Sequence, residues 1–142
     1  MKDNLEQNMY VRTKWGYICK IININDFREP SMKYGVEASY LKDIMFIGDD
    51  DVVKASYNII DILECGDIIK LFMEDDIDEE DTNIFELIAI NYNDNEIGVF
   101  NSDFQIEFFP IENLRGILTH EQMEQMAYKM EEWLNELVRI MG

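Results

Sequence analysis

The chain has 142 residues, of which 47% are hydrophobic, enough for one domain or for two small β subdomains around an apolar core. Its formal net charge is −18, which disfavours direct binding to the phosphates of DNA or RNA. Only two cysteines, Cys19 and Cys65, and one histidine, His120, are present. These counts exclude a disulfide scaffold and most zinc sites, and we expect no metal and no cofactor.

The negative charge is concentrated in the second part of the chain. Residues 1–48 carry seven Lys/Arg and six Asp/Glu, whereas residues 49–142 carry five and twenty-four. Such an acidic surface favours a basic partner. No apolar leader region is present, and no run approaches the roughly 18 apolar residues of a membrane span. We therefore expect a soluble, cytosolic (cytoplasmic) protein without membrane contact.

The first third of the chain predicts short strands joined by polar turns. Residues 10–23 predict a β-hairpin, because β-branched residues alternate along its second arm and Gly16 suits its turn. After a loop, residues 36–40, 44–47 and 52–54 predict three further strands, and we expect the last to pair with an earlier one. The acidic turn before it does not have the spacing of a calcium loop. Its carboxylates are either a solvated turn or contacts for a basic partner: Asp49, Asp50 and Asp51.

The stretch VVKASYNIIDILECGDIIK, residues 52–70, joins these strands to those that follow. Apolar spacing at 59–63 favours a short helix over a bent strand, with Ser56 as its cap. Gly66 and Asp67 then end this element and open a strand at 68–73.

The run EDDIDEED at 74–81 holds seven acids in eight positions and predicts an exposed loop, because like charges repel. If extended, it spaces its charges at about 4 Å, near the ~3.4 Å between phosphates along one DNA strand. One interpretation is that these charges only keep the protein soluble. The other is that they dock on a basic partner through Glu74, Asp75, Asp76, Asp78, Glu79, Glu80 and Asp81.

Residues 84–92, IFELIAINY, predict a central strand that is apolar on both faces and covered on two sides. A turn at 93–96 and two strand-like segments at 97–100 and 104–109 follow it. Four phenylalanines in this region could stack on bases, but acidic residues lie among them and no basic residue is near. We therefore expect core packing for Phe100, Phe104, Phe108 and Phe109.

The last segment, 119–142, predicts an amphipathic helix. Thr119 suits the N-cap, Gln122 completes a capping box, and His120 falls in an exposed first turn. Apolar residues recur at helical spacing at Met123, Met126, Ala127, Met130, Leu134, Leu137, Val138 and Met141. We expect this stripe to pack on the β core. The alternative is a homodimer seam or a partner-binding face, since Met-rich surfaces adapt to varied partners, through Met123, Met126, Met130, Leu134, Leu137 and Met141.

No motif for a nucleophile elbow, a phosphate-binding loop, a dinucleotide site or a zinc protease occurs. Among thirty acids no carboxylate pair can be singled out, so we expect no enzyme. The expected fold is mainly β (α+β), with two small SH3-like or open-barrel antiparallel sheets. We divide it into an N-terminal β subdomain (1–55), a second β subdomain (56–118) and a C-terminal amphipathic helix (119–142) packed across one sheet.

Three segments resemble a pattern in small, uncharacterised acidic proteins of phages and prophages from low-GC Gram-positive bacteria. They are residues 52–70, the segment Arg12-Thr13-Lys14-Trp15-Gly16, similar to an R-T-K-x-G hairpin, and Ile117 to Gln122, similar to an I-x-T-x-E-Q segment. The acidic run at 74–81 is not part of that pattern. The resemblance implies no activity and no catalytic residue. It implies a phage context, in which small acidic proteins often act on host machinery and imitate the charge of DNA.

These features predict a non-enzymatic phage-type protein that docks its carboxylates on a basic, nucleic-acid-binding surface of a host protein. An anti-defence inhibitor of the anti-CRISPR type would act in this way, although this step is an analogy. Two alternatives stay open. One is a structural or accessory phage module that forms a homodimer through its Met-rich helix, and the other is a small-ligand-binding β-barrel protein.

Overall fold

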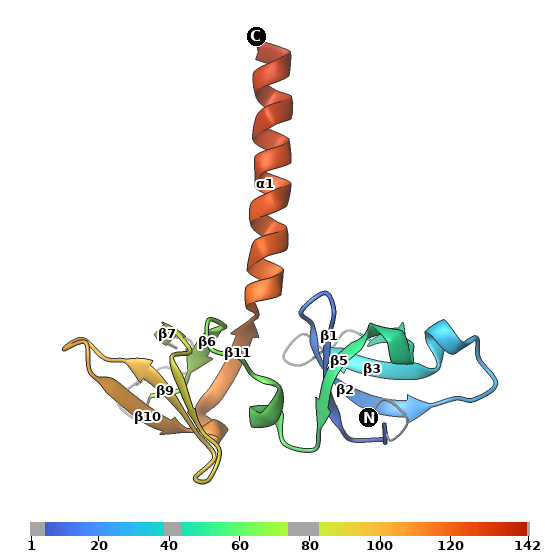
Figure 1. Cartoon of the computed structure of the whole chain (residues 1–142), viewed down its shortest axis with the longest axis horizontal. Coiled ribbons are helices and arrows are strands. Elements are labelled where there is room, and N and C mark those ends of the chain that lie inside the picture. The colour runs from blue at the N-terminus through green and yellow to red at the C-terminus, as the bar shows by residue number, and fades with distance from the viewer. Residues whose placement is uncertain (1–4, 39–43, 74–82, 142) are drawn as a thin grey trace.

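The computed structural model describes residues 5–38, 44–73 and 83–141, which are mainly β with one long C-terminal helix (Figure 1). The described residues form eleven short strands in three antiparallel sheets, and these strands do not close into a barrel. The expected mainly β, α+β class is confirmed, with the strands grouped in three sheets rather than in two.

The N-terminal sheet has the strand order β4-β3-β2-β1-β5. Its strands are β1 (Tyr10–Thr13), β2 (Ile18–Ile24), β3 (Tyr34–Ala38), β4 (Ile44–Ile47) and β5 (Val52–Ser56). The hairpin of β1 and β2 is confirmed, and so is the pairing of β5 with an earlier strand, which is β1. Alternate side chains of these strands point to one side and form a first hydrophobic cluster, which includes Val11, Cys19, Ile21 and Val36.

A single 3-10 turn at Ile59–Ile62, rather than an α-helix, connects the N-terminal sheet to the rest of the chain. Asn58 caps this turn, because its side chain accepts a hydrogen bond of 3.2 Å from the backbone N–H of Ile60. Ser56, the expected cap, instead accepts from the backbone N–H of Asn58 at 3.1 Å. The turn remains short because Leu63 is already in an extended conformation and buried.

Two three-stranded sheets follow, and they share a second hydrophobic cluster. We call the sheet of order β11-β6-β7 the β6 sheet and the sheet of order β10-β9-β8 the β9 sheet. Their strands are β6 (Ile68–Leu71), β7 (Asn83–Glu86), β8 (Ala89–Asn91), β9 (Glu96–Phe100), β10 (Ile106–Pro110) and β11 (Leu114–Leu118).

The prediction of one central strand over residues 84–92 is wrong. The chain breaks at the buried Leu87, so that β7 becomes an edge of the β6 sheet and β8 an edge of the β9 sheet. Leu87 exchanges backbone hydrogen bonds with Gly66 (2.9 Å) and Asp67 (2.8 Å), whereas the N–H of Ile88 bonds to Gly98 at 2.8 Å. The segment is apolar on both faces because it crosses from one sheet to the other.

The helix α1 (His120–Met141) rises between the two groups of strands and ends far from all three sheets (Figure 1). None of its residues in the described range is buried. The expectation that the helix packs across a sheet is therefore wrong. Its first turn is fixed between the β1–β2 turn and the segment before β6, and this attachment directs the helix axis away from the sheets.

Candidate functional site

The base of α1 is held by five charged or titratable side chains from three segments. We call this group the junction: Arg12 from β1, Glu64 and Asp67 from the segment before β6, and His120 and Glu121 from the first turn of α1. The side chains of Arg12 and Asp67 are fully buried, with 0% exposure each. The junction therefore joins β1, the segment before β6 and α1 around a buried ion pair, whereas Glu64, His120 and Glu121 stay partly exposed.

The guanidinium of Arg12 hydrogen-bonds to Asp67, to Glu121 and to the backbone of Ile62 at the same time. Two of its N–H groups donate to the two carboxylate oxygens of Asp67, at 2.8 and 2.9 Å. Its Nε donates to Glu121 at 2.8 Å, and Nη1 also donates to the carbonyl of Ile62 at 3.0 Å. Burial lowers the pKa of Arg12, but the hydrogen bonds to Asp67 and Glu121 outweigh this effect and raise it. The guanidinium thus stays charged and keeps its geometry.

Asp67 also caps the first turn of α1. Its Oδ1 accepts from the backbone N–H of His120 at 3.1 Å, and its Oδ2 accepts from that of Glu64 at 2.9 Å. The expected capping box is confirmed, with Thr119 N–H donating to Gln122 Oε1 at 3.1 Å and Gln122 N–H donating to Thr119 Oγ1 at 3.4 Å. These bonds satisfy backbone donors that a helix start leaves unpaired.

The β1–β2 turn packs directly on the first turns of α1. The hydroxyl of Thr119 donates to the carbonyl of Gly16 at 2.7 Å, and the amide of Gln125 donates to the carbonyl of Trp15 at 3.2 Å. Gly16 has φ of +90°, and a Cβ there would lie 2.3 Å from Thr119 Oγ1 and 2.8 Å from the Cβ of Glu121. Only glycine fits this position, because any other residue would be strained at this positive φ and its Cβ would clash with Thr119 and Glu121.

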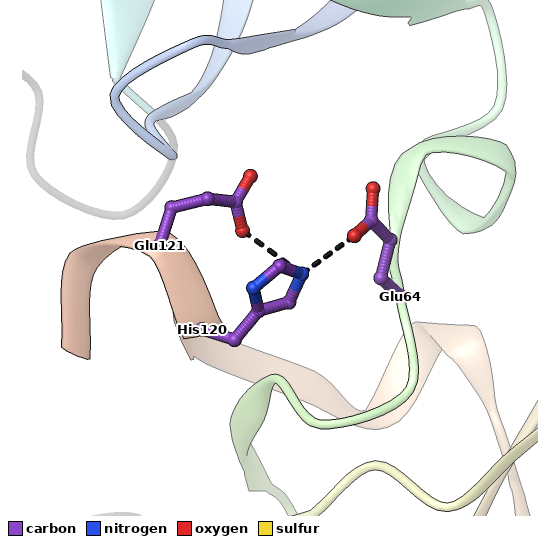
Figure 2. A group of neighbouring side chains, drawn as sticks. All are labelled: Glu64, His120 and Glu121. Atoms are coloured by element: carbon purple, nitrogen blue, oxygen red, sulfur yellow. Dashed lines mark hydrogen bonds and ion pairs between the residues drawn. The ribbon is translucent and has the colours of Figure 1, made fainter. Parts of the chain in front are cut away.

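His120 is not a free, exposed residue as its place in the first turn suggested. Figure 2 shows its ring between Glu64 and Glu121, with Nε2 at 2.6 Å from Glu64 Oε1 and 3.1 Å from Glu121 Oε1. The hydrogen bond to Glu64 raises the pKa of His120 above its ordinary value. The hydrogen bond from Arg12 lowers the pKa of Glu121. Burial raises the pKa of Glu64, but the bonds from Lys54 and His120 outweigh it and lower the pKa overall.

His120, Glu64 and Glu121 are the described residues that could together ligate a metal ion, with ligand atoms within 4.8 Å of one another. Fixed cations already neutralise both carboxylates, because Lys54 Nζ lies 2.8 Å from Glu64 and the Arg12 guanidinium binds Glu121. A divalent ion at this position would lie beside a buried guanidinium, and its binding would have to displace these ion pairs. The arrangement suits an ion-pair network better than a metal centre.

Our sequence analysis did not select Arg12, Glu64 or Asp67 as site residues. The structure nevertheless brings together the three segments that carry the resemblance noted above. Arg12 lies in the segment 12–16, Glu64 and Asp67 in 52–70, and Glu121 in 117–122. Their contacts join residues far apart in the sequence, so no local pattern could have identified the junction.

The second feature is the apolar surface of α1, which faces solvent along its length. At about 100° per residue, ten apolar side chains fall within roughly 160° of the helix circumference. We call them the apolar arc: Met123, Met126, Ala127, Met130, Trp133, Leu134, Leu137, Val138, Ile140 and Met141. Met130 is 61% exposed, Trp133 60% and Ile140 77%. The arc contains all six predicted interface residues, and the structure adds Trp133 and Ile140 to the predicted stripe.

Carboxylates flank the arc. By helical spacing, Glu124 and Glu131 border one edge, and Lys129 and Glu136 border the other. The helix as a whole carries five glutamates against one lysine and one arginine. An apolar face with acidic edges complements an apolar groove with basic edges.

The predicted acidic contacts are only partly within the described residues. The run 74–81 lies outside them. In the turn before β5, Asp49 accepts from the Tyr34 hydroxyl at 2.6 Å, and Asp51 pairs with Lys14 at 3.1 Å. A hydrogen bond from the backbone of Gly48 lowers the pKa of Asp51. Asp49 and Asp51 therefore make contacts within the chain, whereas Asp50 is exposed.

The expectation of core packing for four phenylalanines holds for one of them. Phe109 stacks on Phe85 with ring centroids 6.5 Å apart, beside the second cluster. Phe100, Phe104 and Phe108 are exposed by 47%, 85% and 42%, so the expectation is wrong for them. The reason is the alternation along β9 and β10, which turns Phe100 and Phe108 to the outer face of the hairpin.

No protein-family model, no curated protein and no solved structure matches the chain. Among the helices within the described ranges, none is both long enough and apolar enough to cross a membrane. Function is therefore inferred from the side chains and their geometry.

Proposed function

We propose that the protein is a non-enzymatic binding protein that inserts α1 into an apolar groove of a basic partner protein. The observation that carries this proposal is the apolar arc, in which large side chains such as Trp133 and Ile140 face water over the length of the helix. A soluble helix normally buries such a face, and extended exposed apolar patches mark interaction sites. The junction supplies a rigid base that presents the arc away from the sheets.

The charge of the chain supports a basic partner. The net charge is −18, and the glutamates at the edges of the arc would meet lysines and arginines at the rim of the groove. The acids at 74–81 are proposed as additional contacts. In the phage context that the resemblance implies, the partner would be a nucleic-acid-binding protein in the cytosol of a bacterial host, and the protein would act as an anti-defence inhibitor.

A homodimer is the second candidate, favoured by the regular 3-4 spacing of Met123, Met126, Met130, Trp133, Leu137 and Ile140. Two observations favour a different partner. The arc spans roughly 160°, wider than the seam of a two-stranded coiled coil, so that a groove covers it better. A second copy would also bring another charge of −18 and repel the first.

The proposal is tested by comparing three forms of the protein in affinity capture from a bacterial host lysate. The first is the native chain, the second is Met126→Glu/Met130→Glu in the arc, and the third is Tyr128→Glu/Asn135→Glu on the opposite face of α1. We expect the native chain and the third form to retain the same basic protein and the second form to lose it. With the purified partner, binding should weaken steeply as salt is raised.

Retention by all three forms, or binding that does not respond to salt, would contradict the proposal. Sedimentation of the native chain separates the two candidates. A monomer is expected at micromolar concentration. A dimer that Met126→Glu/Met130→Glu dissociates would establish the homodimer in place of the basic partner.

A further inference from the structure

A groove of about 420 Å³ separates the N-terminal sheet from the β6 sheet. Lys70 pairs across the β6 sheet with Gly116 and Ile84, and Ile68 pairs with Leu118, so these residues share one face. Neighbouring residues on the other face, such as Ile69, belong to the second hydrophobic cluster. The groove is therefore bounded mainly by the outer face of the β6 sheet, although Ile69 and Ile117 also reach it. Its other sides are lined by Tyr17, Ile18 and Ala38 of the N-terminal side and by Gln122 of α1.

Gly116 makes room on this face of the sheet. It has no side chain, and the stem of Lys70 lies across it, since a Cβ at Gly116 would be 3.2 Å from Lys70 Cδ. The stem of Lys70 thus forms part of the apolar wall, while its ammonium group can reach a ligand in the groove. Gly116 leaves the space, and Lys70 supplies one of the two positive charges of the groove in an apolar setting.

The charge of the groove is opposite to that of the whole chain. Its described lining contains two cations, Lys70 and Arg115, and no aspartate or glutamate. Lys70 makes no ion pair within the described residues. Arg115 is held at the edge of the groove, donating to the carbonyl of Glu112 at 2.6 Å, with its guanidinium 5.3 Å from the Phe72 ring centroid. Two cations and no carboxylate in the described lining favour an anionic ligand here, against the repulsion of the chain's net charge of −18. Glu86, which pairs with Ile68, lies on the same face but outside this lining.

We infer that the groove binds a small amphipathic carboxylate, with its apolar body against Ile68, Ile84 and Leu118 and its carboxylate at Lys70. A volume of about 420 Å³ falls within the range of small-molecule sites, which are mostly apolar and have few polar groups. Such sites are common where two packed units meet. This site is separate from the apolar arc, so the inference goes beyond the proposed partner binding.

The test is calorimetric titration with decanoate, below the concentration at which it forms micelles, and with the uncharged decanol. The native chain should bind one decanoate saturably. Lys70→Gln should weaken decanoate binding about three- to tenfold and leave decanol binding unchanged, because only the ion pair is lost. Lys20→Gln is the matched control, since Lys20 lies over the Tyr10 ring outside the groove, and it should bind like the native chain.

Ile84→Glu introduces a like charge into the groove from an exposed position and should abolish decanoate binding without unfolding the chain. The inference is overturned if the native chain shows no saturable binding, or if Lys70→Gln binds decanoate like the native chain. Loss of decanoate binding in Met126→Glu/Met130→Glu would place the ligand on α1 and also overturn it. That arc variant should bind decanoate normally even if partner capture fails, which separates the two proposals.

Discussion

Arg12 and Asp67 carry the energetics of the junction. A buried ion pair contributes little net stability compared with apolar residues, but removing one partner leaves an unpaired buried charge at a cost of about 3–5 kcal/mol. Here the pair also fixes the position of α1 relative to β1. Arg12 binds Asp67 through two parallel hydrogen bonds and reaches Glu121 of α1 with its remaining donors. A lysine has no such planar fork and could not hold both carboxylates in this way.

Gly16 gives a sharp test of the contact between the β1–β2 turn and α1. Gly16→Ala should destabilise the chain both through its positive φ and through the clash with Thr119. The matched control is Gly66→Ala, because Gly66 has φ of +100° and nothing within 4 Å of a Cβ. We expect the control to cost about 1–2 kcal/mol from the backbone alone, and Gly16→Ala about 1–3 kcal/mol more. If urea unfolding gave the same free energy for Gly16→Ala and Gly66→Ala, the turn would not pack on α1.

His120 makes the stability of the junction dependent on pH. Its folded pKa is raised, so its contribution is complete below its ordinary value of 6.5 and is lost as the pH rises through the folded pKa. The pKa values of Glu64 and Glu121 are lowered, so their contribution is complete above 4.5 and is lost as the pH falls through their folded values. The junction should therefore be most stable between about 4.5 and 6.5.

The difference in unfolding free energy between the native chain and His120→Gln measures this effect. It should be largest near pH 6 and shrink as the pH is raised, because neutral histidine no longer attracts Glu64, Glu121, Asp67 and the more distant Glu124. Arg12, whose pKa is raised, stays charged throughout this range and serves as a constant background. A difference that does not change between pH 6 and 9 would contradict the role assigned to His120.

At the scale of elements, α1 is attached at its base and unsupported along its arc. Met126→Glu/Met130→Glu should therefore change the unfolding free energy of the monomer by less than about 0.5 kcal/mol, as surface substitutions do. If the helix packed on the core instead, the two new charges would be buried and would lower the unfolding free energy by several kcal/mol. Urea unfolding at a concentration where the protein is monomeric distinguishes the two.

Local patterns predicted most elements but not what surrounds them. The alternation that predicts β1 and β2, and the capping box of α1, depend on neighbours in sequence and were correct. The apolar residues at 84–92 indicate burial on both sides, but periodicity cannot show that the chain changes sheets at Leu87. Likewise, helical spacing identifies the arc on α1 but says nothing about the element that covers it.

At the scale of the whole molecule, the junction could not be predicted because its contacts are distant in sequence. Arg12 lies 55 residues from Asp67 and 109 from Glu121, and no local pattern relates them. The overall acidity, by contrast, follows directly from composition. It predicts the sign of a partner's charge, and the position of contacts at 74–81 remains a prediction.

The three parts of the molecule meet at the junction and leave two surfaces for other molecules, the apolar arc and the groove beside the β6 sheet. β1 of the N-terminal sheet, the segment before β6 and α1 all contribute to the junction, and α1 extends from it away from the sheets (Figure 1). At 22 residues, α1 is about 33 Å long, enough to enter a groove on a partner while the sheets remain outside. The partner would then contact the molecule mainly through one helix.

The central claim, that α1 presents an uncovered apolar arc, is tested most directly by the fluorescence of Trp133. In a Trp15→Phe variant it is the only tryptophan left, and its side chain is 60% exposed. At concentrations where sedimentation shows a monomer, we predict red-shifted emission and acrylamide quenching close to that of free tryptophan. Blue-shifted emission that resists quenching in the same monomer would show that α1 packs on its own sheets, and would contradict the account.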